Sequence, residues 1–264
     1  MFQREMMRNI KLVLEYDGTN YHGWQTQPNL PTIQGAVEEA LAQLTKTSVR
    51  IVGAGRTDTG VHAEGQVANF HTDLQIPIIA FQKGLNTLLP RDIIVCSVTE
   101  VDADFHSRFS ATSRRYRYTI LNRTYRSALL RHTSYFYSVP IDAALVDAIC
   151  RSIVGKWDFS SFQKTGSDRL NPVCEVFEAC CWKAGEYVYF EIEANSFLRG
   201  MVRAIVGTIL KSIKNASGNV EKACVQFHNI LEAKDRALAG PSVPAHGLSL
   251  IRVEYNDKQE TRFL

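Results

Sequence analysis

The segment GRTDTGVH, Gly55–His62, holds the residues best placed to do chemistry. It presents one carboxylate, Asp58, in a loop bracketed by glycines, with Arg56 two positions before it. Glycines let the backbone turn tightly and approach a ligand closely. In an extended chain, side chains two residues apart point to the same side, so Arg56 would hold and orient the carboxylate of Asp58. Asp58 could then serve as a catalytic base or nucleophile, and the alternative is a surface turn with a structural ion pair.

A second segment combines arginine with tyrosine and contains no acidic residue between Asp104 and Asp142. The formal net charge of the chain is only +3, so positive charge is concentrated here. Arginine forms planar, bidentate contacts with phosphate, and aromatic rings stack on bases. We therefore expect a nucleic acid as partner, and the alternative is a solvated strand face. The candidate RNA-binding arginines of this segment are Arg108, Arg114, Arg115 and Arg117.

Several other function classes fit the sequence poorly. No stretch approaches the roughly 18 consecutive apolar residues of a membrane span, and the first residues lack a signal-peptide core. The six cysteines are scattered without a C-x-x-C pair, which predicts no metal site. Gly53 and Gly55 begin a G-x-G-x-x-G pattern, but Asp58 occupies the third glycine's place, so we expect no nucleotide cofactor. These observations favour a cytoplasmic protein with no cofactor, no metal and no membrane.

The elements that must position these residues follow the same order in each half of the chain. Hydrophobic periodicity in the first half predicts β-α-β-β-α-β, with Thr32 capping the first helix. The expected strands are Ile10–Tyr16, Val49–Val52, Gln66–Thr72 and Ile93–Val101, and the expected helices are Ile33–Leu44 and Ile78–Leu88.

The second half repeats this order with one additional helix. Its expected strands are Tyr116–Leu121, Val173–Lys183, Tyr187–Ala194 and Leu248–Tyr255, and its expected helices are Ile141–Val154, Ser196–Lys214 and Val220–Lys234. The pattern predicts an α+β fold of two ferredoxin-like halves in a pseudo-twofold arrangement, with antiparallel sheets and helices on one face. We place the halves at residues 1–105 and 106–264. On the long helix, Arg199 and Arg203 would lie near the N-terminal end, where the helix dipole favours anions.

Five motifs, in this order and spacing, resemble the A-type tRNA pseudouridine synthases over essentially the whole chain. They are EYDGTNYHGWQ, GRTDTGVHA, HSRFSATSRRYRY, FSSF and NSFLRGMVR. The resemblance implies an isomerase that converts uridine to pseudouridine in the anticodon stem-loop of tRNA. It also implies a homodimer whose basic clefts hold the tRNA, and no cofactor or metal.

The resemblance assigns roles to four residues. Asp58 corresponds to the essential catalytic aspartate, and Tyr116 to the tyrosine that packs on the target base. Arg56 and Arg203 correspond to arginines that line the site, and Arg203 is expected to pair with Asp58. The stretch FLRGMVR departs from relatives that carry histidine before the methionine, which affects the RNA contact expected of Arg199 and leaves the Asp58 chemistry unchanged.

Two rival functions account for part of the sequence. A non-catalytic RNA-binding module would explain the arginines and tyrosines, but a carboxylate in a phosphate-binding cleft opposes binding. A base-excising glycosidase also needs an aspartate near the sugar, and it would release free uracil, which an isomerase retains.

Overall fold

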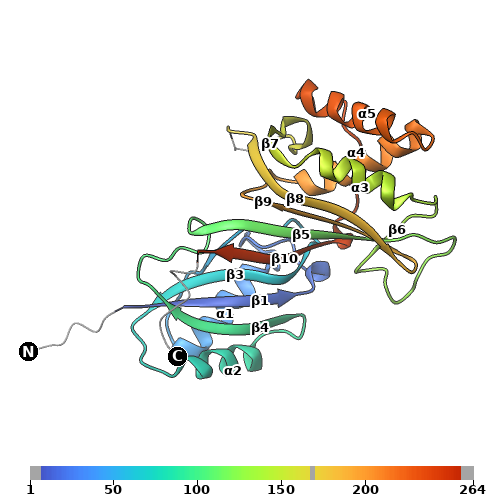
Figure 1. Ribbon diagram of the computed structural model, residues 1–264. Helices are drawn as coiled ribbons and strands as arrows, with labels where there is room; N and C mark the ends of the chain where they lie inside the picture. The colour runs from blue at the N-terminus through green and yellow to red at the C-terminus, as the bar shows by residue number, and fades with distance from the viewer. Residues whose placement is uncertain (1–6, 167–169, 257–264) are drawn as a thin grey trace, which may run out of the picture. The chain divides into compact units, whose positions relative to one another are not determined.

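The computed structural model describes residues 7–166 and 170–256, and these form two compact units. The first unit comprises residues 7–112 with 250–256, and the second comprises residues 113–249. Both combine an antiparallel sheet with helices, so the fold is α+β (Figure 1).

The first unit is built around a strand, β1, that pairs antiparallel with a strand on each side. β1 (Arg8–Tyr16) lies between β3 (His62–Thr72) and β4 (Ile93–Val101), and the short β2 (Val52–Gly53) pairs with β3. The final strand, β10 (Leu248–Tyr255), follows β3 in the sheet order. Two helices, α1 (Ile33–Thr45) and α2 (Ile78–Leu88), pack against each other, and a 3-10 turn, η1 (Gly18–Asn20), follows β1.

The second unit has the strand order β5-β9-β8-β7, and every pairing along it is antiparallel. The strands are β5 (Ala111–Leu121), β7 (Gly155–Asp158), β8 (Val173–Ala184) and β9 (Tyr187–Ala194), with the short β6 (Tyr135–Phe136) parallel to β5. Three helices lie together on one side of this sheet (Figure 1): α3 (Ala143–Ser152), α4 (Met201–Ala216) and α5 (Val220–Ala233). Two 3-10 turns, η2 (Ser160–Phe162) and η3 (Ala245–Gly247), complete it.

Most elements expected from periodicity are confirmed, several to the residue. α2, β4, β9 and β10 have the predicted bounds, and Thr32 caps α1 by accepting a hydrogen bond from Gly35 N at 3.2 Å. The strand expected at Val49–Val52 is wrong, because only Val52–Gly53 pair with β3. The short strands β6 and β7 were not expected, since two to four residues carry too little periodicity to detect.

The predicted start of α4 is also wrong, and the reason is local. α4 begins at Met201, five residues after the expected Ser196, because Gly200 has φ +71°, a left-handed conformation outside the helix. Met201 N donates to Leu198 O at 3.1 Å and closes a turn before the helix. Arg199 therefore precedes α4 as an exposed turn residue, and of the two predicted helix arginines only Arg203 lies on α4.

Each unit has its own apolar core beneath its helices. In the first unit the rings of Phe70 and Phe81 meet edge to face at 5.6 Å, and both are almost fully buried. In the second, Phe162 and Phe227 stack at 5.4 Å with an interplanar angle of 12°. Across the described residues we find no helix with the length and apolar character needed to cross a membrane.

Candidate functional site

Asp58 lies in a half-buried position in the loop between β2 and β3. The loop turns back tightly, because Val61 N donates to Asp58 O at 3.1 Å and Gly60 has φ +76°. A side chain at Gly60 would be strained in this left-handed conformation. The GRTDTGVH segment therefore forms a closed turn that presents the Asp58 carboxylate.

A buried network of polar side chains fixes the residues that lead from β2 into this turn. The hydroxyls of Tyr16 and Thr57 lie 2.8 Å apart, and the Gln66 amide donates to Gly55 O at 2.8 Å and to the Tyr16 hydroxyl at 3.5 Å. Tyr16, Thr57 and Gln66 are only 3%, 7% and 0% exposed. Breaking hydrogen bonds between buried polar groups is costly, so the network holds Gly55 and Thr57, the residues on both sides of Arg56, in one conformation.

The residues of the motif EYDGTNYHGWQ that follow β1, Asp17–Gln25, form a turn rich in aromatic side chains. This aromatic turn packs directly against the Asp58 loop. Trp24 N donates to Thr57 O at 3.0 Å, so the two backbones are hydrogen-bonded. A Cβ on Gly23 would come within 2.5 Å of Thr57 O and 3.1 Å of the Asp58 carbonyl carbon. The position therefore admits only glycine. Two of the motifs singled out in the sequence, EYDGTNYHGWQ and GRTDTGVHA, are thus parts of one structure.

His62 ties the other end of the loop to the same turn. Its Nδ1 lies 3.1 Å from Gly18 N and 3.1 Å from an Asp17 carboxylate oxygen. A Cβ on Gly18 would overlap Val61 O at 2.1 Å, so the backbones are as close as they can be. His62 is 7% exposed and acts as a structural link between η1 and β3.

Arg56 is exposed on the same loop. Among the residues that the structure describes, we find no hydrogen bond or ion pair formed by its side chain. Its guanidinium is therefore presented to solvent, where a phosphate can reach it. The predicted contact of Arg56 with Asp58 stays a prediction.

Tyr116 and Arg203 belong to the second unit. Tyr116, on β5, is 8% exposed, and its ring meets Phe197 edge to face at 5.0 Å and 82°. Arg203, on the first turn of α4, donates through Nε to Val243 O at 2.7 Å, and Val243 N donates back to Arg203 O at 3.2 Å. The ring of Tyr116 and the stem of Arg203 are therefore held in fixed orientations by their own unit.

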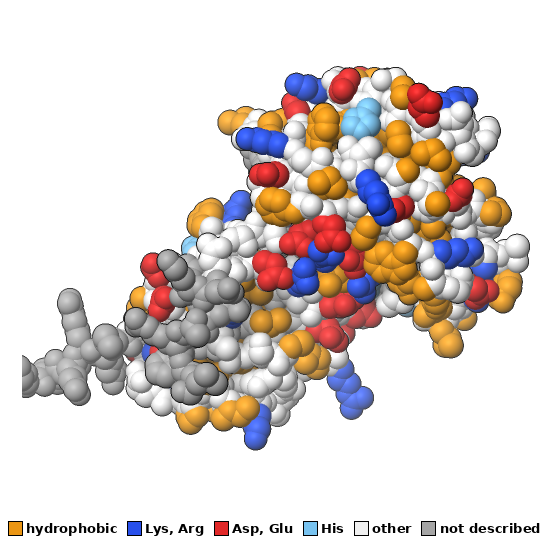
Figure 2. All heavy atoms as spheres, in the orientation of Figure 1, with side chains coloured by type: hydrophobic (Ala, Val, Ile, Leu, Met, Phe, Trp, Pro, Cys, Tyr) orange, Lys and Arg blue, Asp and Glu red, His pale blue; other side chains and the backbone are white. Residues whose placement is uncertain are grey.

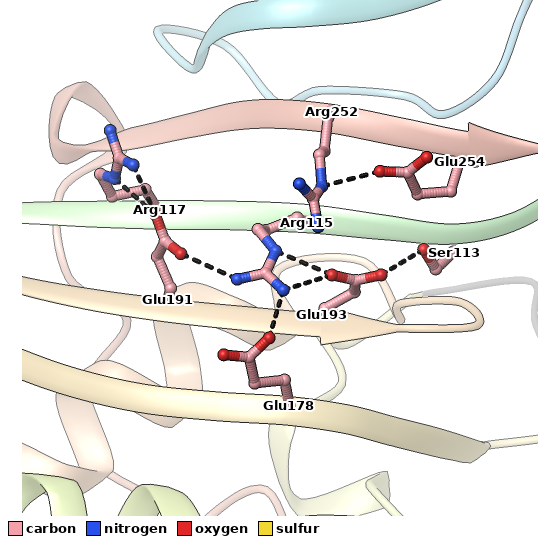
Figure 3. Close-up of polar contacts among 8 residues, drawn as sticks. All are labelled: Ser113, Arg115, Arg117, Glu178, Glu191, Glu193, Arg252 and Glu254. Carbon is pink, nitrogen blue, oxygen red and sulfur yellow. Dashed lines mark hydrogen bonds and ion pairs between the residues drawn. The ribbon is translucent and has the colours of Figure 1, made fainter.

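Two arginines of β5, Arg115 and Arg117, bond to glutamates of β9 and β8 (Figure 3). Arg115 bonds to Glu193 at 2.7 Å, to Glu191 at 3.0 Å and also to Glu178. Arg117 bonds to Glu191 at 2.7 Å. Burial acts to lower the pKa of Arg115, but the hydrogen bonds to the three glutamates outweigh it and raise that pKa further above its ordinary value.

The segment between Asp104 and Asp142 contains no acidic residue in the sequence, but in the structure its β5 part lies beside glutamates of other strands. Over β5, β9 and β8, red and blue side chains lie side by side in Figure 2. Arg117 also lies 5.9 Å from the ring centres of Trp182 and Tyr189, which stack on each other at 5.2 Å. Two of the arginines that predicted a nucleic-acid surface here are therefore already bonded to glutamates of β9 and β8, because antiparallel pairing aligns β5 with β9 and β9 with β8.

The remaining candidate arginines lie elsewhere. Arg108 is exposed, 5.6 Å from the ring centre of Phe109, which is itself 76% exposed and packs on His106. Arg114 donates to Asn195 O at 2.9 Å, and Arg199 is exposed before α4. Phe109 was not singled out from the sequence, although it stands inside the motif HSRFSATSRRYRY beside Arg108.

Other residues that build the site were also missed. Tyr16 and Gln66 hydrogen-bond to Thr57 and Gly55 of the Asp58 loop, and the ring of Phe197 packs against the ring of Tyr116. The signal for Tyr16 and Phe197 was present, since each lies within or beside a motif, but their roles depend on contacts over long stretches of chain. Within residues 7–166 and 170–256 we find no group of three His, Cys, Asp or Glu side chains arranged to hold a metal.

Comparison with known proteins identifies what this chain is similar to. The profile of the tRNA pseudouridine synthase family matches residues 12–110 and 149–256. A tRNA pseudouridine synthase A of Acetivibrio thermocellus is 43% identical over 249 residues, covering 94% of this chain and all of the relative. Those of Thermoanaerobacter sp. and Clostridium acetobutylicum are 40% and 41% identical over the same shares. Among solved structures, a chain of a Cbf5-Nop10-Gar1 complex matches 91% of this chain and 57% of its own length, at a TM-score of 0.37 and 10% identity.

Proposed function

The chain belongs to the tRNA pseudouridine synthase family and has tRNA pseudouridine synthase activity, and from this premise we propose that Asp58 is its catalytic carboxylate. The observation that carries the proposal is the construction of the Asp58 loop. A buried network on one side and the aromatic turn on the other leave this carboxylate half-exposed on a fixed backbone.

The reaction needs little beyond such a carboxylate and a closed site. Pseudouridine formation breaks the N1–C1′ bond of uridine, turns the uracil, and joins C5 to C1′ with loss of the C5 proton. Nothing is oxidised and no water is added. Asp58 supplies either the nucleophile or the base at C2′, and both roles need the same fixed carboxylate.

Tyr116 is proposed to stack on the uracil and retain it while the glycosidic bond is open. Its ring is held at a fixed angle by Phe197, which limits its rotation. Stacking of a base on an aromatic ring contributes about 1–3 kcal/mol. Arg56 and Arg203 are proposed to line the same site, with Arg203 as the partner of Asp58, as the family resemblance implies.

The tRNA contacts are proposed for the arginines whose guanidiniums are exposed or at the surface, namely Arg108, Arg114 and Arg199. Phe109 supports this proposal, because an exposed ring beside an arginine suits an unstacked base. That Arg115 and Arg117 contact RNA stays a prediction. Their guanidiniums would have to exchange glutamate partners for phosphates.

The target is proposed to be a uridine of the anticodon stem-loop, and the protein to be a cytoplasmic homodimer of two related ferredoxin-like halves. The strand order supports the duplication, because β5-β9-β8 repeats the antiparallel order β1-β3-β2. Exposed aromatic side chains on β8, Phe177 and Trp182, are the kind of surface that a second copy covers. Sedimentation of the full chain as a dimer would support this assignment, and a monomer would contradict it.

The decisive experiment uses tRNA that lacks pseudouridine and carries tritium at uracil C5. Forming the new bond expels that tritium, so the wild type releases it to water and Asp58→Asn does not, although it still binds tRNA. Tritium release by Asp58→Asn would remove Asp58 from the mechanism. Release of free uracil would point to base excision instead, and binding without any release to a non-catalytic RNA-binding module.

A further inference from the structure

Between β5 and β6 the second unit carries a loop, residues 122–134, that contains none of the site residues proposed above (Figure 1). The loop belongs to the segment between Asp104 and Asp142 that has no acidic residue, and its cations are Arg123, Arg126 and Arg131. A connection of this length without a helix or strand is longer than packing requires, and such loops commonly bind a ligand or partner.

Both ends of the loop are fixed to the second unit. The buried amide of Asn122 donates to Tyr137 O at 2.7 Å, and its backbone N–H donates to Glu186 O at 2.8 Å. At the other end, Ser134 Oγ donates to Leu130 O at 3.0 Å. The loop therefore has a defined conformation, and its side chains are presented from a fixed backbone.

Arg123 holds the ring of Tyr125 in place. Its guanidinium carbon lies 4.1 Å from the centre of the ring, which is a cation–π contact over one face. The same guanidinium donates through Nε to Tyr125 O at 2.9 Å, through Nη2 to Arg126 O at 3.3 Å and through Nη1 to Glu186 at 2.7 Å. These bonds leave the guanidinium little freedom, so the ring that it contacts is held in one orientation.

The other face of the Tyr125 ring is open. Tyr125 is 62% exposed although Arg123 covers one face. Among the residues that the structure describes, no second ring packs on it and its hydroxyl forms no hydrogen bond. A fixed aromatic ring with one free face is a surface on which a nucleobase can stack, and it has already lost most of the freedom that stacking would cost.

Arg126 follows Tyr125 in the chain and adds a positive charge without a partner. Its side chain is exposed, and within residues 7–166 and 170–256 we find no hydrogen bond or ion pair that it forms. Arg131 is exposed as well. The loop itself contains no acidic residue, and Glu186 from outside it is already bonded to Arg123. A free guanidinium next to a flat ring suits the phosphate and the base of a nucleic acid.

A second copy of the chain fits this loop less well than RNA does. Leu129 is 90% exposed, and with Tyr125 it offers apolar contact to another protein surface. A twofold contact of loop with loop, however, would place Arg126 of one copy near Arg126 of the other, and the cores of protein interfaces are depleted of charge. The phosphates of RNA would neutralise the same arginine.

We propose that Tyr125 stacks on an unpaired base of the bound tRNA, with Arg126 on a neighbouring phosphate. This contact rests on the tRNA pseudouridine synthase activity of the chain. The base is not the reacting uracil proposed for Tyr116, which lies about 16 Å before the end of β5 that leads into the loop. Because every base has a π-face, stacking here adds affinity without selecting a sequence.

The test measures the Kd of the full chain for tRNA that lacks pseudouridine, at several salt concentrations. Tyr125→Leu removes the ring, Tyr125→Phe keeps it without the hydroxyl, and Arg126→Gln removes the charge. Leu129→Ala is the matched control, because Leu129 is an exposed apolar residue of the same loop. Tyr125→Trp gives a direct signal, since a base that stacks on the new indole quenches its fluorescence. This signal is the difference from the wild type with its own three tryptophans.

We expect Tyr125→Leu to raise the tRNA Kd about tenfold, and Tyr125→Phe and Leu129→Ala to leave it unchanged. Arg126→Gln should reduce the slope of log Kd against log salt by about 0.7–0.9. Addition of tRNA should quench the Tyr125→Trp signal. Tritium release at saturating tRNA should keep the wild-type kcat in all four loop variants, so a failure of the Asp58 proposal would be seen separately, in Asp58→Asn.

Three results would overturn the proposal. In the first, Tyr125→Leu binds tRNA as tightly as the wild type, or Tyr125→Phe loses as much affinity as Tyr125→Leu. In the second, tRNA leaves the Tyr125→Trp fluorescence unchanged. In the third, Tyr125→Leu and Leu129→Ala both sediment as a smaller species than the wild type, which would make a second copy of the chain the partner of this loop.

Discussion

The hydroxyl of Tyr16 lies 2.8 Å from that of Thr57, joining the last residue of β1 to the residue before Asp58. This contact spans 41 residues of sequence and is buried at both ends. It connects the central strand of the first unit to the loop that presents the carboxylate. The position of Asp58 therefore depends on the strand as well as on the loop's own glycines.

Tyr16→Phe removes that connection without changing the shape of the core. We expect the free energy of unfolding to fall by about 1–3 kcal/mol, because Thr57 Oγ1 loses its buried partner. We also expect kcat for tritium release to fall while tRNA affinity is kept. Tyr255→Phe is the control, since it also removes one tyrosine hydroxyl, which donates to Ser107 O at 2.7 Å, and leaves the Tyr16–Thr57 contact in place. Equal losses of kcat in both variants would show that Tyr16 has no specific role at the site.

Gly23→Ala tests the close packing of the aromatic turn on the same loop. Its Cβ would meet Thr57 O at 2.5 Å, so the Asp58 backbone must shift. A displacement of about 1 Å at a catalytic group can cost about a hundredfold in rate, and we expect a loss of that order in kcat. Gly185→Ala is the matched control, because Gly185 also has a positive φ but no atom within 4 Å of the new Cβ. A Gly23→Ala variant with wild-type kcat would refute the packing argument.

Arg114→Gln and Arg115→Gln separate RNA contact from structure. Loss of one phosphate contact reduces the slope of log Kd against log salt by about 0.7–0.9, and we expect this for Arg114→Gln. For Arg115→Gln we expect an unchanged slope and a loss of about 3 kcal/mol in stability, because the mostly buried Glu191 and Glu193 lose their ion pairs with Arg115, although Glu191 keeps its bond to Arg117. Salt titrations of tRNA binding measure the slope for both variants, and urea unfolding measures their free energy of unfolding. A reduced slope in Arg115→Gln would restore it as an RNA contact.

Asp158 links the stability of the protein to pH. Burial acts to raise the pKa of Asp158, but hydrogen bonds from Ser160 and Lys234 outweigh it and hold that pKa below its ordinary value of 3.8. A carboxyl with a lowered folded pKa stabilises the fold above its unfolded pKa, and this contribution is lost as pH falls through the folded pKa. Asp158→Asn should therefore cost about 1 kcal/mol at neutral pH and nothing once the wild-type carboxyl is protonated. Urea unfolding of both proteins across this range measures the difference, and a difference independent of pH would contradict the assignment.

The sequence alone determined the features that neighbouring residues encode. Hydrophobic period and capping located α2, β4, β9 and the Thr32 cap, because these depend on residues within a few positions of each other. The GRTDTGVH spacing located the Asp58 loop for the same reason. Where a local signal was overlooked, as with the left-handed Gly200 before α4, the expected boundary was wrong by five residues.

Only the tertiary structure decided which distant residues meet. The glutamates of Arg115 lie 63 to 78 positions away, and they reach it because the register of β5, β9 and β8 aligns them. The same is true of Tyr16 with Thr57, and of β10, which is the last described strand along the chain but follows β3 in the sheet. Composition showed how much charge the chain carries, whereas strand pairing decided which of those charges face an opposite charge.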